Sequence, residues 1–331
     1  MNPPKISVIL PTRNPDRVRL AEVLAALARQ TLPPDQWDVC IVDNGSSAPL
    51  AAPDLAACSR ARVVREERPG LLAARLAGLR GTAGELVVFI DDDTVPAPGF
   101  LAAAVGFMAS RPRLGTAGGR ILPRYLAPTP PWLDRMAWLL ALRDNGPEPL
   151  EWALSDGRPL PNWTPIGAGL LLRRTAGDAY LLHVQRNREF IERISWRGQG
   201  AGGVEDKDIV LCCLRAGWST GYGPDLVLEH IIPPGRLSLA YFEKLLPGSQ
   251  RLWARTLLAH RLCDHRPVPP ATLALRKGKA WFAFRAWRSP ADRLGWLASC
   301  GFLDGLADHY RDPVDYGPPA AAAPAPNQVR L

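Results

Sequence analysis

The chain has 331 residues, of which 47% are hydrophobic, and a formal net charge of +8 at pH 7. This length allows one large domain with a smaller appendage, and the apolar content excludes a chain that is disordered throughout. The positive charge favours acidic partners, such as phosphates, anionic lipid headgroups or nucleic acid, without choosing among them.

The cysteines and the apolar runs bear on the cellular compartment. None of the six cysteines forms a C-x-x-C pair, and buried thiols in a reducing compartment are favoured over a disulfide framework. The first residues resemble a strand and not a signal peptide, and no run of about 18 apolar residues predicts a spanning helix. We therefore expect a cytoplasmic protein, with a peripheral position on the inner face of the cell membrane left open.

Strand-like and helix-like patterns alternate over the first hundred residues. We expect strands at Ile6–Leu10, Val39–Val42, Arg62–Val64 and Leu86–Ile90, and helices over Leu20–Leu27 and Leu72–Leu79. This alternation predicts an α/β fold, in which a mostly parallel sheet is flanked by helices. Ligands of such sheets bind beyond the carboxyl ends of the strands, and polar clusters follow three of the predicted strands.

The region from about Gly115 to Gly203 is less regular and rich in Pro, Trp and Gly. It contains one predicted strand, Ala168–Leu172, and ends in a glycine-rich loop, Gly198–Gly203, ahead of Glu205 and Asp206. The loop contains G-x-G-x-x-G, but it follows no clear strand, so a dinucleotide site is rejected.

The character of the chain changes after about residue 250. Residues 251–311 hold eleven Lys or Arg against four Asp or Glu, with tryptophans interleaved. We expect residues 251–312 to form a basic, Trp-rich helical appendage, and the Pro/Ala-rich residues 313–331 to form a disordered tail. The appendage either packs its helices on the core or lies on an anionic membrane surface.

The most informative motif is the run Asp91-Asp92-Asp93, which follows a predicted buried strand. Three adjacent carboxylates repel one another unless a cation is present, and oxygen ligands suit Mg²⁺ or Mn²⁺. On an extended segment, Asp91 and Asp93 point to one side while Asp92 points elsewhere. The alternative is a solvated acidic turn or a helix start.

Five segments in order carry a family resemblance: I-S-V-I-L-P-T-R-N, V-D-N-G-S-S, G-E-L-V-V-F-I-D-D-D-T, G-G-V-E-D-K-D-I and E-H-I-I-P-P-G-R. Together they resemble a family 2 glycosyltransferase of the GT-A fold, over roughly residues 5–250, so residues 1–250 are expected to form the GT-A domain. The resemblance implies metal-dependent, inverting transfer from a nucleoside-diphosphate sugar, with UDP-sugar as the expected donor. It further implies a hydroxyl acceptor, with a lipid-linked glycan as one candidate, in polysaccharide or glycolipid assembly.

The resemblance also assigns roles to particular residues. The nucleotide would be held by Pro11, Thr12, Arg13, Asp43, Asn44, Arg75, Asp91 and Asp92. Asp43 is equally explained as a turn residue in D-N-G, and Arg75 as a helix-surface arginine. Acceptor contacts are expected around Trp132, Trp138, Trp163 and Trp196, without individual assignment.

The metal and the catalytic base follow from the same resemblance. Asp91, Asp93 and His230 would hold Mn²⁺ or Mg²⁺, and His230 is otherwise a structural histidine. Asp206 would be the general base that takes the proton of the acceptor hydroxyl, with Glu205 next to it. The alternative for both acids is a favourable position at a helix start.

Two other functions fit the sequence less well. A sugar-phosphate nucleotidyltransferase would need a glycine-rich, basic loop after the first strand, where this chain has P-T-R-N-P. A basic nucleic-acid-binding protein would leave the three aspartates unexplained, and no helix-turn-helix or zinc-finger pattern supports it, so no nucleic-acid partner is expected. His260, Cys263 and His265 lack a fourth ligand, and we attribute their spacing to chance.

Overall fold

The computed structural model describes residues 4–195 and 202–317. Residues 196–201, which hold Trp196 and most of the predicted glycine-rich loop, lie outside the described residues. The strands are β1 (Ile6–Thr12), β2 (Trp37–Asp43), β3 (Ala61–Arg65), β4 (Leu86–Phe89), β5 (Thr94–Pro96), β6 (Leu114–Tyr125), β7 (Leu150–Trp152), β8 (Leu171–Arg173) and β9 (Ser219–Ile232).

These strands form one sheet in the order β3-β2-β1-β4-β8-β6-β9-β5, with β7 paired to β9. The first four strands are parallel to one another, and the long strands β6 and β9 form a second parallel pair. Strand β8 joins the two groups through antiparallel pairings, and β5 and β7 also run antiparallel to β9. This mixed, mostly parallel sheet confirms the predicted α/β class.

Helices cover both faces of the sheet, as predicted. The first five are α1 (Arg17–Ala28), α2 (Leu71–Gly81), α3 (Phe100–Ala109), α4 (Arg174–Ile194) and α5 (Glu205–Arg215). Helices α1 and α3 bury their apolar side chains against alternate residues of β1, β2 and β4. The intervening residues of the same strands pack against α2, α4 and α5. A strand buried on both faces explains the continuous apolar runs in the sequence.

The middle of the chain is more regular than the sequence indicates. Strand β6 and helix α4 occupy much of the stretch for which the sequence predicts irregular structure. Gly115, Gly118 and Gly119 lie in β6, and Gly119 is needed there because Leu226 of β9 comes very close to it. A Cβ atom at Gly119 would lie 2.0 Å from the carbonyl oxygen of Leu226, so no larger residue fits there.

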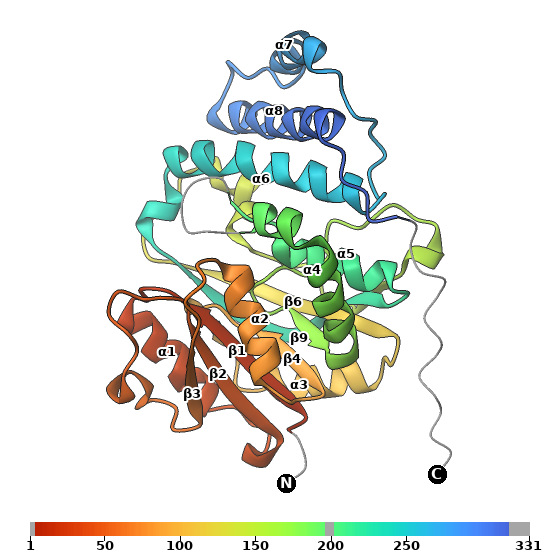
Figure 1. The fold of residues 1–331 in the computed structure, drawn as a ribbon. Coiled ribbons are helices and arrows are strands. Elements are labelled where there is room, and N and C mark those ends of the chain that lie inside the picture. The colour runs from red at the N-terminus through yellow and green to blue at the C-terminus, as the bar shows by residue number, and fades with distance from the viewer. Residues whose placement is uncertain (1–3, 196–201, 318–331) are drawn as a thin grey trace.

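Three further helices follow the sheet: α6 (Leu239–Ala259), α7 (Leu273–Ala283) and α8 (Pro290–Arg311). They are stacked outward from the sheet, with α6 nearest to it and α7 farthest away (Figure 1). The sequence places the end of the main domain at residue 250. Helix α6 continues through this position without a break, and the domain boundary stays a prediction. Among the described residues, no helix has both the length and the apolar character needed to cross a membrane.

Short 3₁₀ helices complete the architecture. They are η1 (Pro34–Gln36), η2 (Ala52–Leu55), η3 (Leu133–Leu140), η4 (Leu154–Asp156), η5 (Pro234–Leu237) and η6 (Pro270–Thr272). The six cysteines are free thiols, as the sequence indicates.

Residues 313–317, the start of the segment predicted to be disordered, are packed on the protein. The backbone N–H of Tyr316 donates to the carbonyl of Ala259 at 3.0 Å, and Asp315 pairs with Arg261. Val314 and Tyr316 join an apolar cluster with α4 and α6. The remainder of that predicted tail, residues 318–331, lies outside the described residues.

Candidate active site

A cavity of about 680 Å³ opens at the carboxyl ends of β1, β2 and β4. Eleven of the twelve residues with a predicted site role line it, and the exception is Asp43. These eleven are Pro11, Thr12, Arg13, Asn44, Arg75, Asp91, Asp92, Asp93, Glu205, Asp206 and His230. Residues from six separate parts of the sequence therefore share one cavity.

The pairing of β5 with β9 brings Asp93 to His230. Thr94, the first residue of β5, is opposite His230 in the antiparallel register, and the N–H of Ile231 donates to the carbonyl of Asp93 at 2.9 Å. Asp93 and His230 are both buried, and Asp93 Oδ1 lies 3.5 Å from His230 Nε2. Asp91 lines the same cavity, but the ligand atoms of Asp91, Asp93 and His230 do not form a group as close as that of His183, Asp208 and His260.

His230 presents a lone pair to this place. Its Nδ1 lies 2.9 Å from the carbonyl oxygen of Leu140, which can only accept a hydrogen bond, so Nδ1 carries the proton. A neutral ring then has its lone pair on Nε2, which faces Asp93 and Arg236. This is the tautomer that a metal-binding histidine requires.

Arg236 is the site residue that the sequence reasoning missed. Its Nη1 lies 3.2 Å from Asp93 Oδ2 and 3.2 Å from His230 Nε2, so its positive charge sits between two predicted metal ligands. Arg236 belongs to η5, follows Pro233, Pro234 and Gly235, and ends the quoted segment E-H-I-I-P-P-G-R. The sequence feature that could have pointed to Arg236 is its position six residues after His230, in the same quoted segment.

The three aspartates have different protonation behaviour. Burial raises the pKa of Asp91, and the charge of Asp93 raises it further. Burial also raises the pKa of Asp92, to about 6. For Asp93, burial acts to raise the pKa. A hydrogen bond and the positive charge of His230 when its ring is protonated, together with the charge of Arg236, outweigh burial, and the pKa of Asp93 is lowered. Asp93 is therefore the carboxylate whose charge the protein itself stabilises most.

Asp92 contacts the end of β1. Residues 91–93 form a turn, in which the N–H of Thr94 donates to the carbonyl of Asp91 at 3.1 Å, and not the extended segment that the sequence predicts. The Asp92 carboxylate accepts a hydrogen bond from the hydroxyl of Thr12, at the end of β1. This contact ties the aspartate run to the polar segment Pro11–Arg13, which is predicted to bind the nucleotide.

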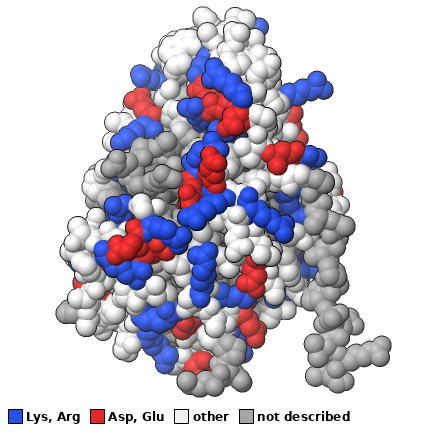
Figure 2. Space-filling view, in the orientation of Figure 1, with Lys and Arg blue, Asp and Glu red and all other residues white. Residues whose placement is uncertain are grey.

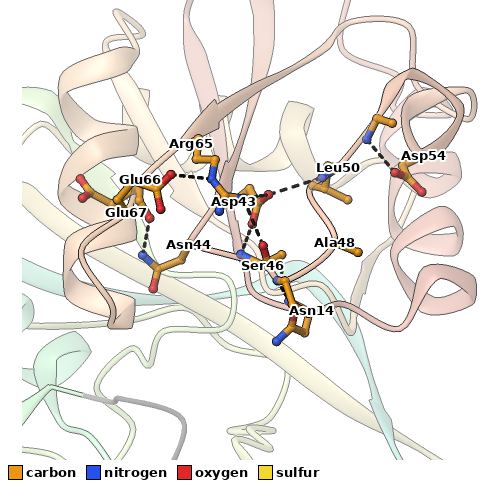
Figure 3. Close-up of polar contacts among 12 residues, drawn as sticks. Asn14, Asp43, Asn44, Ser46, Ala48, Leu50, Asp54, Arg65, Glu66 and Glu67 are labelled. Carbon is orange, nitrogen blue, oxygen red and sulfur yellow. Dashed lines mark hydrogen bonds and ion pairs between the residues drawn. The ribbon is translucent and has the colours of Figure 1, made fainter.

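Asp43 is not among the residues that line this cavity. It is 1% exposed, and its carboxylate accepts from the N–H groups of Ser46 and Leu50 and from Arg65 (Figure 3). Burial acts to raise its pKa, but these donors lower it overall. In the structure, therefore, the Asp43 carboxylate holds the turn after β2, and its neighbour Asn44 lines the cavity instead.

Arg75 and Glu205 form a buried ion pair at the wall of the cavity. Arg75 Nη1 donates to Glu205 Oε1 at 3.0 Å, and both residues are 2% exposed. The guanidinium also lies over the ring of Phe89. Arg75 is therefore not the surface arginine of the alternative interpretation, and Glu205 has a compensated charge.

Asp206 lies beside this pair, in the first turn of α5. Its Oδ2 accepts a hydrogen bond from the backbone N–H of Gly167 at 2.7 Å. A Cβ atom at Gly167 would lie 2.1 Å from Arg75 Nη2 and 3.4 Å from Asp206 Oδ2, so glycine allows this close approach. Asp206 is half-buried, which leaves its carboxylate accessible from the cavity.

A second cavity, of about 790 Å³, begins where the first one ends. Lys207, the residue after Asp206, lines it together with Trp138, Trp152 and Trp253. Trp152 is 3% exposed, and its Nε1–H has no hydrogen-bond partner among the described residues. Trp138 belongs to the region from which acceptor contacts are expected.

A carboxylate–histidine cluster lies outside both cavities. Asp208 Oδ1 is 2.8 Å from His260 Nε2, and its Oδ2 is 3.6 Å from His183 Nε2. In the described part of the chain, this is the one group of three such residues whose ligand atoms all lie within 4.8 Å of one another. His260 thus has partners other than Cys263 and His265, in agreement with the view that their spacing is chance.

Comparisons with known proteins agree on one family. The sequence model described as "Glycosyl transferase family 2" matches residues 7–164, and that described as "Glycosyl transferase family group 2" matches residues 86–260. An N-acetylglucosaminyltransferase of Sinorhizobium fredii is 28% identical over 78% of this chain and 60% of its own length. One of Bradyrhizobium diazoefficiens is 26% identical over 78% of this chain and 51% of its own. The chain therefore spans little more than half the length of these relatives.

Among solved structures, S. aureus TarS 1-349 in complex with UDP aligns with 95% of this chain and 93% of that chain. The sequence identity is 16% and the TM-score is 0.48.

Proposed function

Because the chain belongs to the family 2 glycosyltransferases, we propose that it transfers a sugar from a nucleoside-diphosphate donor to a hydroxyl group, with inversion at the anomeric carbon. The observation that carries this proposal is the composition of the 680 Å³ cavity. One wall holds the aspartate run with His230 and Arg236, and another holds the carboxylate of Asp206. Groups suited to a diphosphate and a group suited to an acceptor proton thus face the same space.

The proposed donor is a UDP-sugar, and UDP-N-acetylglucosamine is the first candidate, because the relatives that match most of this chain are named N-acetylglucosaminyltransferases. Thr12, Arg13 and Asn44 line the part of the cavity at the ends of β1 and β2, where the nucleoside would lie. The diphosphate would lie near Asp93 and His230, at the end of β4.

We propose that Asp91, Asp93 and His230 hold Mn²⁺ or Mg²⁺. The fit rests on two observations: the Nε2 lone pair of His230 faces Asp93, and the Arg236 cation already lies between them. Both observations describe a site that stabilises a positive charge. Its carboxylate oxygens and imidazole nitrogen are ligands that Mn²⁺ and Mg²⁺ accept. A divalent cation there supplies charge neutralisation for the leaving diphosphate.

Asp206 is the proposed general base. The acceptor oxygen attacks the anomeric carbon, the bond from that carbon to the diphosphate breaks, and the acceptor proton passes to Asp206. The backbone N–H groups of Gly167 and Lys207 fix the carboxylate in place: Oδ2 accepts from Gly167 at 2.7 Å and Oδ1 accepts from Lys207 at 2.8 Å. Each carboxylate oxygen has a second lone pair that can accept the proton of the acceptor hydroxyl. Glu205 is proposed to position Arg75 and not to take the proton, because it is buried in an ion pair with that residue.

The second cavity is proposed to receive the acceptor. It adjoins Asp206 through Lys207, and tryptophan rings provide flat apolar faces against which sugar rings pack. The buried Nε1–H of Trp152 is a donor that an acceptor hydroxyl could satisfy. A lipid-linked glycan is the acceptor class that we propose, because the C-terminal helices are rich in Lys and Arg.

The test is to incubate the protein with UDP-N-acetylglucosamine and candidate glycans, and to measure UDP release. The product linkage is then assigned by NMR, with an inverted anomeric configuration expected. Calorimetry of UDP binding with Mn²⁺ and with EDTA tests the metal, and Asp93→Asn is the matched site variant. Equal UDP affinity in Mn²⁺ and in EDTA would contradict the metal assignment, and failure to bind any nucleotide sugar would contradict the function.

A further inference from the structure

Helix α7 and the turn after it carry large apolar side chains on the surface. Leu275 is 64% exposed, Phe282 is 70% exposed and Trp287 is 60% exposed. Leu275 and Phe282 lie seven residues apart, two helical turns, and so share one face. The ring centroids of Phe282 and Trp287 are 5.8 Å apart. These three residues form one exposed surface, which we call the α7 patch.

Basic side chains surround the α7 patch. Four of them are exposed and take part in no ion pair among the residues that the structure describes: Arg276, Lys279, Arg285 and Arg288. Residues 265–291 contain no Asp or Glu at all. Figure 2 shows the end of the molecule that α7 forms as mainly white, with blue Lys and Arg side chains next to it. In the described part of the chain, the charges of Arg276, Lys279 and Arg285 are therefore not balanced by an ion pair, whereas the charge of Arg288 is close enough to Asp292 to help lower the pKa of that carboxyl.

The patch is firmly attached to the rest of the molecule. Lys277, on the inner side of α7, pairs with Asp304 of α8 at 2.7 Å, and Trp296 Nε1 donates to the carbonyl of Lys277 at 3.1 Å. The rings of Trp281 and Trp296 pack edge to face, with centroids 4.8 Å apart. Because the inner side of α7 has these contacts, the exposure of the outer side does not come from a detached helix.

We propose that the α7 patch and its four cations dock the protein on an anionic lipid membrane. Aromatic and aliphatic side chains partition into the interfacial layer of a bilayer, while neighbouring Lys and Arg contact anionic headgroups. A second copy of this chain is a poor occupant, because it would bring two sets of unpaired cations together. Single-stranded nucleic acid would match the charge, but it offers no apolar phase for Leu275.

The location of the patch has a consequence for the active site. Helix α7 packs on α8, and α8 packs along α6, whose first turn carries Tyr241 to the wall of the 680 Å³ cavity. Docking through α7 would thus hold the cavity in a fixed relation to the membrane surface. This inference goes beyond the proposed transfer reaction, and its test needs no donor or acceptor.

The experiment is co-sedimentation of the full chain with vesicles of phosphatidylcholine alone and of phosphatidylcholine with phosphatidylglycerol. We expect binding to the mixed vesicles, weakened by salt, and little binding to phosphatidylcholine alone. Phe282→Ser with Trp287→Ser should weaken the binding at least about tenfold, since two large apolar side chains lose their contact with lipid. Arg276→Gln with Lys279→Gln should weaken it by roughly twentyfold or more, about fivefold for each cation.

Matched controls lie on other parts of the surface. Leu182→Ser removes an apolar side chain of α4 that is 54% exposed. Arg29→Gln with Arg113→Gln removes two exposed cations, one at the C-terminal end of α1 and one between α3 and β6. These variants should sediment like the unaltered protein.

UDP affinity is measured for every variant, and the patch variants should keep it, which shows that they are folded. Trp287→Phe provides a second readout, because brominated lipids should quench less tryptophan fluorescence in this variant than in the unaltered protein. Equal losses for the controls, equal quenching, or complete displacement from vesicles by single-stranded RNA at low concentration would overturn the proposal. None of these results bears on transfer itself, so the two proposals fail separately.

Discussion

Asp91–Asp93 and Asp208 are both acidic sites with shifted pKa values, but the protein surrounds them differently. Asp208 is completely buried, and although burial acts to raise its pKa, His183 and His260 lower it to about 2. Asp91 and Asp92 have raised pKa values, because burial and their mutual repulsion outweigh the cations near them. One acidic site is compensated within the protein, whereas the other retains an excess of negative charge that a ligand can neutralise.

Helix α5 also carries one acidic residue that faces a ligand cavity and one whose charge is compensated within the protein. Asp206 lines the cavity, whereas Asp208 lies two positions later, on roughly the opposite side of the helix, and faces α4 and α6. The same substitution, Asp to Asn, at these two positions therefore separates a catalytic role from a structural one.

The largest expected effect is that of Asp206→Asn on the transfer rate. Loss of a general base should lower the rate by about 10²–10⁴-fold, while UDP affinity stays nearly constant because Asp206 contacts neither the nucleotide nor the metal in the proposed arrangement. Initial rates and UDP calorimetry check the two parts. Full turnover by this variant would show that Asp206 is only a helix-start carboxylate. A loss of UDP affinity as severe as that of Asp93→Asn would contradict the separation of donor and acceptor sides.

Asp208→Asn should have the opposite profile. The free energy of unfolding at pH 7 should fall by about 2–3 kcal/mol, because a carboxylate with a pKa near 2 in the folded state is stabilised relative to the unfolded chain. UDP affinity of the folded variant should not change. Urea denaturation measures the first quantity, and Asp206→Asn, expected to lose less than about 1 kcal/mol, is the control.

The pH dependence of Asp208→Asn gives a sharper check. The lowered pKa means that the stabilising contribution of Asp208 is present above about pH 4 and is lost as the pH falls through 2. The pKa of His260 is also lowered, chiefly by burial, so below about pH 6.5 protonation of the unfolded chain reduces stability further. The deficit of the variant should therefore be constant at neutral pH and shrink below pH 4. A deficit that grows in acid would contradict the assignment.

Asp92→Asn should instead stabilise the protein, by about 1–2 kcal/mol at pH 8. Asp92 has a pKa of about 6 in the folded state, so its ionised form costs stability above pH 6, and this cost disappears as the pH falls toward 4. The amide oxygen of Asn can still accept from Thr12. Denaturation at pH 8, 6 and 4 should show a gain that declines to zero, and a gain independent of pH would rule out charge as its cause.

The sequence predicts the donor half of the site better than the acceptor half, for a physical reason. Strand ends are marked by local patterns, so the polar residues after β1, β2 and β4 are recognisable as neighbours from the order of the residues alone. Asp208 cannot be assigned in this way, because its partners lie 25 and 52 residues away and nothing local announces their contact. Trp152 and Lys207 could not be assigned from the sequence either, because they line one cavity only after the chain between them has folded.

The sequence alone does not separate two physical uses of one residue. D-N-G fits a turn and, by family resemblance, a nucleotide contact, and in the structure the Asp43 carboxylate holds the turn. Gly119 shows the same limit within a strand, because it is required where the carbonyl oxygen of Leu226 comes close, and nothing in the local sequence indicates that approach.

The smallest expected effect concerns Arg236, and it tests whether the Asp91–Asp93 site is built to exchange one cation for another. Arg236 Nη1 lies 3.2 Å from both Asp93 Oδ2 and His230 Nε2, so it competes with a metal ion for the same lone pairs. Arg236→Ala should therefore tighten the binding of Mn²⁺ alone by roughly fivefold, which corresponds to about 1 kcal/mol for a partly exposed ion pair. Arg236→Lys, which keeps the charge, is the control and should change Mn²⁺ affinity less. Electron paramagnetic resonance of free Mn²⁺ measures both without any donor present. If Arg236→Ala weakens Mn²⁺ binding, the arginine helps to assemble the ligands instead of competing with the ion, and the excess negative charge of this site would have to be explained by another cation.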